Sequence, residues 1–294
     1  MTYLIDASIF IFRAWFSVPD SMTCPNDHPV NAVYGYTRFL SDFLESEQPD
    51  SVAAAFDESL SKSLRCEIYP AYKANREPAP EELKRQFAQC RAVTRSLGVS
   101  EYSDRRFEAD DLIGTMAGRA REAGHCVSIL SRDKDLLQIL QVGDVMWDFI
   151  GDRRIAHDDV PDLFGVRADQ IVDYLALAGD SVDNIPGAPG VGKKTASALL
   201  QHFDSMDELF ANLDSVENVN VRGAAKLGAK LEAHRDQVHM CRELTRIRYD
   251  VPLPDQEEIL AREAPDLDEL NTLYDNVGFG RSLRQQAQRI ADAY

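Results

Sequence analysis

The chain has 294 residues, of which 44% are hydrophobic and 28% are charged, and its formal net charge is −17. This is enough apolar material for one substantial core or for a main domain with a smaller lobe, and the lack of an apolar stretch of about eighteen residues excludes a membrane span. Five scattered cysteines without a CxxC pair argue against structural zinc, and no secretory signal is visible, so we expect a cytoplasmic protein.

The negative charge is unevenly distributed along the chain. Residues 60–95 carry a net charge of +4, residues 222–248 also carry +4, and residues 250–294 carry −6. Without further motifs, ordinary solvated helix faces are the favoured explanation of these blocks. The acidic balance of the whole chain therefore does not exclude a nucleic-acid partner.

Short apolar runs that alternate with helical patterns predict a wound, mainly parallel sheet. The predicted strands are 3–5, 52–56, 127–130 and one near 145–147, and the predicted helices are 31–44, 81–97, 110–123 and 171–178. Strand signals fade after residue 160. The expected fold class is thus α/β over residues 1–160, followed by a helical lobe over residues 161–294 that ends in an acidic tail.

Acidic residues follow three of the predicted strands. Asp6 comes directly after the first, Asp57 after the second, and Asp133 and Asp135 lie just beyond the third. In an open parallel sheet the ligand site lies outside the carboxyl ends of the strands. Carboxylates that meet at one edge repel each other unless cations neutralise them.

Two further acidic groups can join this cluster. Glu108, Asp110 and Asp111 open a helix, and the three-residue spacing places the first and last of them on one face of its first turn. Asp180 and Asp183 follow the helix 171–178. Nine carboxylates without His or Cys favour Mg²⁺ or Mn²⁺ over zinc, and their number fits a two-metal site that acts on a phosphodiester.

Each acid has an alternative interpretation as a helix cap, a turn former or a partner of a helix dipole. The coincidence of five such places favours a metal site. A glycosidase needs only two carboxylates, and a phosphomonoesterase with an Asp nucleophile typically has Asp-x-Asp after the first strand, which Asp6-Ala7-Ser8 does not provide.

The glycine-rich segment 187–195 nearly matches a nucleotide-binding P-loop, but Lys194 stands at the Ser/Thr position and a helix precedes it where a P-loop needs a strand. We instead predict a glycine turn between two helices whose free N–H groups grip a DNA phosphate. A tight structural connection is the alternative, and the carbonyls of the turn are a candidate K⁺ site. The predicted DNA-binding residues here are Gly187, Gly190, Gly192, Lys193 and Lys194.

The basic and aromatic segment 69–76 is a second predicted DNA-binding element. If it were helical, Tyr72 and Arg76 would share one face as a stacking platform and a phosphate-binding fork, and Lys73 would add a cation near the scissile phosphate. Packing of the tyrosine beside surface charges is the alternative. Arg13 is a weaker candidate for DNA binding, for which a surface salt bridge is equally plausible.

In this order the motifs resemble the 5′ nuclease domain of bacterial DNA polymerase I and the wider flap endonuclease superfamily. The segments that carry the resemblance are Asp6, Phe56-Asp57, 69–76 (YPAYKANR), 108–115 (EADDLIGT), 131–137 (SRDKDLL) and 179–187 (GDSVDNIPG). Ala7 and Val182 depart from the usual family pattern, which has Gly and a small hydroxyl residue at these positions.

The resemblance implies a PIN-like core, a helical arch at about residues 60–95 and a helix–three-turn–helix element. It implies 5′-3′ exonuclease and flap endonuclease activity in replication and repair, with two or more Mg²⁺ or Mn²⁺ ions held by all nine acids. It also implies catalytic roles for Tyr72, Lys73 and Arg76 in the arch. The expected partner is branched DNA with a 5′ flap or 5′ end, including RNA-primed DNA. The resemblance implies that a monomer binds it, with a functional link to a DNA polymerase and an association with the nucleoid. The alternative is a non-catalytic, structure-specific DNA-binding protein.

Overall fold

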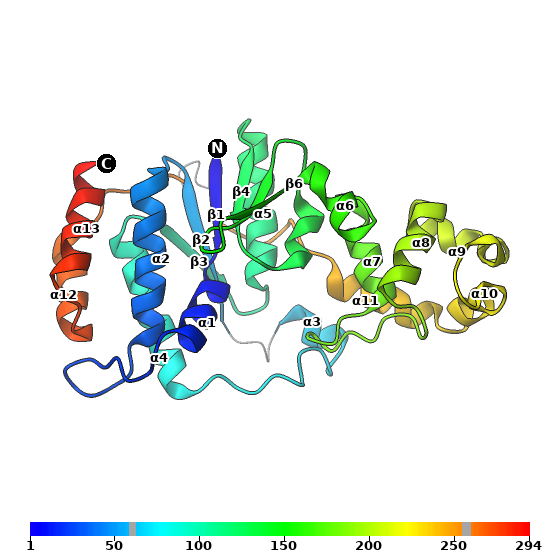
Figure 1. Ribbon diagram of the computed structural model, residues 1–294, viewed down its shortest axis with the longest axis horizontal. Helices are drawn as coiled ribbons and strands as arrows, with labels where there is room; N and C mark the ends of the chain where they lie inside the picture. The colour runs from blue at the N-terminus through cyan, green and yellow to red at the C-terminus, as the bar shows by residue number, and fades with distance from the viewer. Residues whose placement is uncertain (59–62, 255–259) are drawn as a thin grey trace.

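The computed structural model describes residues 1–58, 63–254 and 260–294 (Figure 1). Its centre is a six-stranded sheet with the order β3-β2-β1-β4-β5-β6, in which β6 alone is antiparallel to its neighbour. The strands are β1 (Thr2–Asp6), β2 (Val52–Asp57), β3 (Ser100–Asp104), β4 (Val127–Leu130), β5 (Val145–Asp148) and β6 (Arg153–Ala156).

The first strand occupies the middle of the sheet because it pairs in parallel with both β2 and β4. Its Leu4 lies opposite Ala53 on one side and Ile129 on the other. The strands expected from apolar runs are confirmed. The edge strands β3 and β6 escaped the sequence analysis because polar and charged residues dominate both of them.

Alternate residues of the strands face two different hydrophobic cores. Leu4 belongs to the core on the side of α5 (Ala109–Glu122), whereas Ile5 belongs to the core formed with α1 (Ala7–Ser17), α2 (Asn31–Glu47) and α4 (Glu81–Ser96). Helices therefore cover both faces of the sheet, and the carboxyl ends of its strands remain the place where loops can gather.

Helices dominate the chain after β6, as expected. The helix α11 returns toward the sheet and packs on α7, while α8 to α10 form the far end of the molecule (Figure 1). No helix in the described ranges is both long and apolar enough to cross a membrane. The helices of this lobe are α6 (Val160–Phe164), α7 (Ile171–Ala178), α8 (Lys193–Phe203), α9 (Met206–Ala211), α10 (Ala224–Ala233) and α11 (Arg235–Thr245).

The last two helices lie away from the lobe with which the sequence analysis grouped them. The helices α12 (Leu267–Val277) and α13 (Arg281–Asp292) pack on α4 and α2, at the opposite end of the molecule from α8 to α10 (Figure 1). Their apolar faces, including Leu270, Tyr274 and Ile290, are buried there. Despite its net acidity, this part of the tail is a layer of the α/β region.

The described part of the segment 60–95, where an arch was expected, divides into a short helix, an irregular segment and a helix packed in the core. Residues 59–62 lie outside the described part, and the short helix α3 (Leu64–Ile68) is followed by turns and an irregular segment up to residue 80. The helix α4 packs against α2 and buries Leu83, Cys90 and Val93, so it is the connection between two strands and not part of an arch.

Candidate active site

The two central strands deliver the first pair of carboxylates. Asp6 ends β1 and caps α1 by accepting a hydrogen bond from the N–H of Ile9 at 3.4 Å, while the Ser131 hydroxyl donates to its other oxygen at 2.8 Å. Asp57 ends β2, and its side chain accepts the N–H of Ala109 at 2.9 Å. The capping role proposed as the alternative for Asp6 is therefore real, but it leaves the carboxylate at the carboxyl edge of the sheet.

The first turn of α5 contributes Glu108 and Asp110 beside this pair. Glu108 is buried, and its Oε2 accepts hydrogen bonds from the Tyr72 hydroxyl at 3.2 Å and from Lys73 Nζ at 2.6 Å. Its Oε1 is buried and has no hydrogen-bond donor among the described residues. One oxygen of this carboxylate is thus available to a ligand.

Asp133 and Asp135 come from the segment after β4. Asp133 accepts the N–H of Asp135 at 2.9 Å and thereby caps the short 3-10 helix Lys134–Ile139. Lys134 Nζ lies 3.3 Å from Asp135 Oδ1 as an ion-pair partner, but no described residue donates a hydrogen bond to this buried oxygen. It is the second carboxylate oxygen at this edge without a hydrogen bond.

Asp180 and Asp183 reach the same place from the connection between α7 and α8. Asp180 pairs with Lys134, and Asp183 pairs with Arg76. Lys73 Nζ lies 3.8 Å from Asp183. We call the resulting cluster the acidic edge, and it consists of Asp6, Asp57, Glu108, Asp110, Asp133, Asp135, Asp180 and Asp183.

Negative charge at the acidic edge is only partly neutralised. Burial and the neighbouring Asp57 raise the pKa of Asp6 to about 7, and burial raises the pKa of Asp57 as well. Burial and Asp133 raise the pKa of Asp135 to about 7 and that of Asp110 well above its usual range. These carboxyl groups would each ionise more readily if a cation were placed between them.

Amino and guanidinium groups neutralise the two ends of the cluster. Burial alone would raise the pKa of Glu108, but Lys73 and Arg65 outweigh it and hold that pKa below its usual value. In the same way, Lys134 outweighs burial and lowers the pKa of Asp180. The uncompensated charge therefore lies at the ends of β1, β2 and β4.

Across the described ranges, no three His, Cys, Asp or Glu side chains lie close enough to hold one ion. Lys73, Arg76 and Lys134 pair with three of the carboxylates instead. The ligand set nevertheless fits a hard divalent cation because it consists of carboxylate oxygens. One oxygen of Glu108 and one of Asp135 receive no hydrogen bond from the part of the chain that the structure describes.

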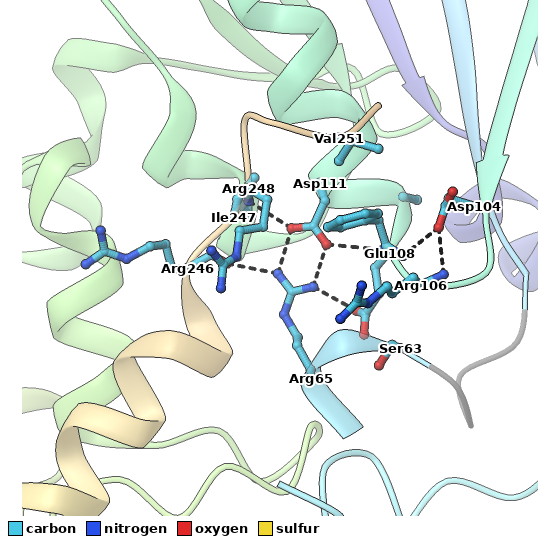
Figure 2. A network of polar contacts seen from close by, with 12 residues as sticks. Ser63, Arg65, Asp104, Arg106, Glu108, Asp111, Arg246, Ile247, Arg248 and Val251 are labelled. Carbon is cyan, nitrogen blue, oxygen red and sulfur yellow. Dashed lines mark hydrogen bonds and ion pairs between the residues drawn. The ribbon is translucent and has the colours of Figure 1, made fainter. Parts of the chain in front are cut away.

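Asp111, the ninth predicted metal ligand, is turned away from this edge. It is 1% exposed, and Arg65 binds both of its oxygens at 2.6 and 2.9 Å (Figure 2). The spacing of Glu108 and Asp111 in one helical turn was correct, but the side chain of the second residue points to a different partner. The structure thus gathers eight of the nine predicted acids.

Tyr72 does not form the stacking platform that the sequence analysis proposed. It is 4% exposed and packs in the core on the α5 side, and its hydroxyl donates to Glu108 and Asp183. The segment is a series of turns in which Lys73 has a φ of 52°, so Tyr72 and Arg76 do not share a helical face. The packing alternative is correct for this tyrosine.

The glycine turn between α7 and α8 depends on the close approach of its two ends. Gly179 and Gly187 both have positive φ, and a Cβ on Gly187 would lie 2.5 Å from the backbone nitrogen of Gly179. Gly192 precedes α8 and makes no side-chain capping bond, and the N–H groups of a first helical turn have no partners within the helix.

The exposed Lys193 and Lys194 lie in this first turn, and Lys230 of α10 approaches Gly190. Arg13, by contrast, pairs with Asp148 at 3.3 Å, which is the salt bridge proposed as its alternative. DNA binding by these residues stays a prediction.

Sequence reasoning missed two cations at the site. Arg65 was counted only in the net charge of residues 60–95, and Lys134 was noted only as part of the motif 131–137. Nothing in their neighbours shows that they reach buried carboxylates. Lys134 stands between Asp133 and Asp135, and that position was the one available signal for it. Ser131, which donates to Asp6, gave no signal of its own.

Comparison with known proteins agrees with this geometry. Two family descriptions match the chain: a 5′-3′ exonuclease N-terminal resolvase-like domain over residues 1–165 and a 5′-3′ exonuclease C-terminal SAM fold over residues 166–268. DNA polymerase I of Rhizobium leguminosarum is 37% identical over 258 residues, which are 85% of this chain and 25% of that protein. Thermostable DNA polymerase I of Thermus filiformis is 36% identical over 284 residues, or 96% and 32%. The chain thus spans about a quarter to a third of these relatives.

Solved structures show the same fold. The T5 D15 protein co-crystallised with metal ions superposes with a TM-score of 0.69 at 17% identity, covering 99% of this chain and 98% of that chain. Human GEN1 in complex with Holliday junction DNA superposes with a TM-score of 0.64 at 14% identity, covering 100% and 72%. The PIN-like sheet and the family resemblance are therefore confirmed, and the chain belongs to the 5′-3′ exonuclease family.

Proposed function

We propose that this protein is a divalent-cation-dependent 5′ nuclease that hydrolyses phosphodiester bonds in DNA with a 5′ flap or a 5′ end. The observation that carries the proposal is the acidic edge. Its eight carboxylates come together beside the carboxyl ends of β1, β2 and β4, where Asp6 and Asp57 end strands and the others lie in neighbouring turns and helix starts. Four of them have raised pKa values, and buried oxygens of Glu108 and Asp135 have no hydrogen-bond donor among the described residues. Such a cluster of buried carboxylates lowers the stability of the folded chain unless a bound ligand compensates the charges.

Divalent cations, Mg²⁺ or Mn²⁺, would be held by these carboxylates and, when bound, supply a water of lowered pKa and a counter-charge for the departing oxygen. The protein's own part is to place the substrate. Lys73 and Arg76 would leave Glu108 and Asp183 as the cations enter, and they would then bind the scissile phosphate. Tyr72 would stay in the core and orient Glu108 through its hydroxyl.

The helical lobe would bind duplex DNA without reading its sequence. The glycine turn offers backbone N–H groups at the start of α8, beside Lys193 and Lys194. The polymerase relatives and a T5 D15 flap endonuclease structure with DNA and metal ions, at a TM-score of 0.66, support DNA as the substrate class. We further propose that the protein acts as a monomer on replication and repair intermediates, including RNA-primed ends, alongside a DNA polymerase, and that K⁺ binds at the turn.

Cleavage of a 5′-end-labelled double-flap DNA tests this proposal. We expect incision near the flap junction with Mg²⁺ or Mn²⁺, none with EDTA, and none with the Asp133→Ala variant. Glu122→Ala is the matched control, because Glu122 is exposed at the far end of α5 and should cleave as the wild type does. Tight binding of the flap without incision in either metal would support the alternative of a non-catalytic DNA-binding protein.

A further inference from the structure

Arg65 and Asp111 form a buried pair just behind the acidic edge (Figure 2). Their side chains are 8% and 1% exposed, and the guanidinium binds the carboxylate through two hydrogen bonds of 2.6 and 2.9 Å. This is the bidentate geometry in which such pairs are strongest. Arg65 Nη1 also lies 4.0 Å from Glu108 Oε2, so the pair adjoins the acidic edge.

Each member of the pair also binds the backbone where α11 ends. Arg65 donates to the carbonyl of Leu244 at 2.8 Å and to that of Arg246 at 3.0 Å, and Asp111 accepts the N–H of Arg248 at 2.9 Å. A cation suits this place because carbonyl groups at the end of a helix lack internal partners. We call Arg65, Asp111 and the backbone of residues 244–248 the clasp.

Both oxygens of the Asp111 carboxylate are occupied by hydrogen-bond donors, so neither is free to bind a metal ion. Its Oδ2 accepts from Arg65 and from the N–H of Glu108 at 3.1 Å, and its Oδ1 accepts from Arg65 and from Arg248. The bond to Glu108 fixes the backbone from which that acid projects into the acidic edge. In this respect Asp111 differs from Asp110, its neighbour, which lies among other carboxylates.

The clasp joins three parts of the molecule that must cooperate in cleavage. Arg65 belongs to α3, which leads into the segment with Lys73 and Arg76, and Asp111 belongs to the turn of α5 that carries the acids. The backbone at 244–248 comprises the end of α11 and the residues after it. The helix α11 packs on α7, and its Thr245 hydroxyl donates to the carbonyl of Val172 in α7 at 3.2 Å. The helix α7 leads directly to the glycine turn.

We propose that the clasp is a positioning device and that Asp111 is a positioning residue and not a metal ligand. The clasp holds the helical lobe and the segment with Lys73 and Arg76 in a fixed position relative to Glu108. The inference rests on the proposed function. A buried ion pair contributes little net stability compared with apolar packing, but its several directed bonds fix the relative placement of the three elements they join.

The test compares Arg65→Gln, Asp111→Asn and their double variant with the wild type, and uses Arg106→Gln as the control. Arg106 lies beside the clasp (Figure 2), and among the described residues its side chain forms an exposed ion pair with Glu67 and no other. We expect each clasp variant to lower kcat on the flap substrate by about 10- to 100-fold, as for other residues that orient a metal site. KM should change less than about threefold, and the double variant should resemble the singles.

Metal dependence separates a positioning role from a ligand role. If Asp111 positions, the Mn²⁺ concentration for half-maximal cleavage stays unchanged in Asp111→Asn, and Arg65→Gln gives the same kinetic pattern. If Asp111 is a ligand, that concentration rises, saturating Mn²⁺ restores kcat, and Arg65→Gln does not reproduce the effect; this result would overturn the proposal. Arg65→Lys, which keeps the charge and loses the fork, serves if either variant fails to fold.

Amide hydrogen exchange without DNA or metal tests the clasp independently of cleavage. Either substitution should speed exchange both in α3 and at residues 244–251, while α12 and α13 stay protected. Faster exchange confined to the substituted element would contradict the coupling. If the wild type cleaves no flap, the proposed function fails, whereas the exchange result still decides whether the clasp joins these elements.

Discussion

The acidic edge and the clasp lie on two sides of one helical turn and place carboxylates in opposite electrostatic environments. Asp110 faces other acids, and burial together with these neighbouring carboxylates raises its pKa well above the usual range. Asp111, the next residue, has both oxygens occupied by Arg65 and by backbone N–H groups. The two side chains differ in orientation, and this alone decides whether a carboxylate meets like charges or donors.

This difference separates ligand-binding acids from structural ones. A protein gains nothing from crowding buried carboxylates unless something outside the chain compensates them, so an unsatisfied cluster indicates a binding site. A carboxylate with every acceptor position filled indicates architecture. The two regions should therefore respond in opposite ways to pH, to substitution and to added cations.

The largest expected effect is on the pH dependence of stability without metal. The pKa of Asp6 is about 7 in the folded chain and 3.8 for the free group. An acid with a raised folded pKa binds protons more tightly in the folded state, so its contribution is favourable below about pH 4 and is lost as the pH rises to about 7. At about 1.4 kcal/mol per unit, this loss is about 4 kcal/mol.

Urea unfolding in EDTA between pH 4 and 7 measures this loss as the difference between the wild type and Asp6→Asn. The wild type should lose stability relative to the variant as the pH rises, and Mn²⁺ should abolish the trend. A difference that stays flat across this range would mean that the acidic edge is already neutralised by Lys73 and Lys134.

Much of the fold could be predicted from the sequence. The central strands are apolar and buried, so short runs of apolar residues in the sequence identify them. The acids that follow these strands lie at one edge of the sheet because the strands are parallel. The edge strand β3 is polar and half-buried, so it carries no such pattern. The packing of α12 and α13 on the α/β part was equally invisible, because an amphipathic helix does not indicate which surface it covers.

The site was less predictable than the fold because side-chain direction depends on partners far away in sequence. Asp111 turns toward Arg65 and the end of α11, and these partners lie 46 and 137 residues away along the chain. Tyr72 was proposed as a stacking platform because it stands one helical turn from Arg76, but the positive φ of Lys73 interrupts any helix there and the tyrosine is buried. Spacing rules within one helix hold no information on such contacts.

A smaller effect, with opposite signs, is expected for neighbouring substitutions in α5. Asp110→Asn removes a charge from among like charges and should raise the free energy of unfolding in EDTA by about 1 kcal/mol, while abolishing cleavage. Asp111→Asn breaks a buried pair and should lower it by about 3 kcal/mol. Urea unfolding of both variants at pH 7 checks the signs. Destabilisation by both would show that Asp110 also has a structural role.

The smallest expected effect compares two arginines that differ in burial. Arg65→Lys keeps the charge but cannot form the two parallel bonds to Asp111 or reach both carbonyls of the clasp, so it should cost about 2 kcal/mol. Arg76→Lys at the acidic edge should cost less than about 1 kcal/mol, because this side chain is 38% exposed and has Asp183 as its ion-pair partner. Thermal unfolding in EDTA gives both values. If the two substitutions lower stability equally, the geometry of the clasp contributes nothing to stability beyond its charge. The contrast between a ligand-binding region and a structural region would then fail at this point.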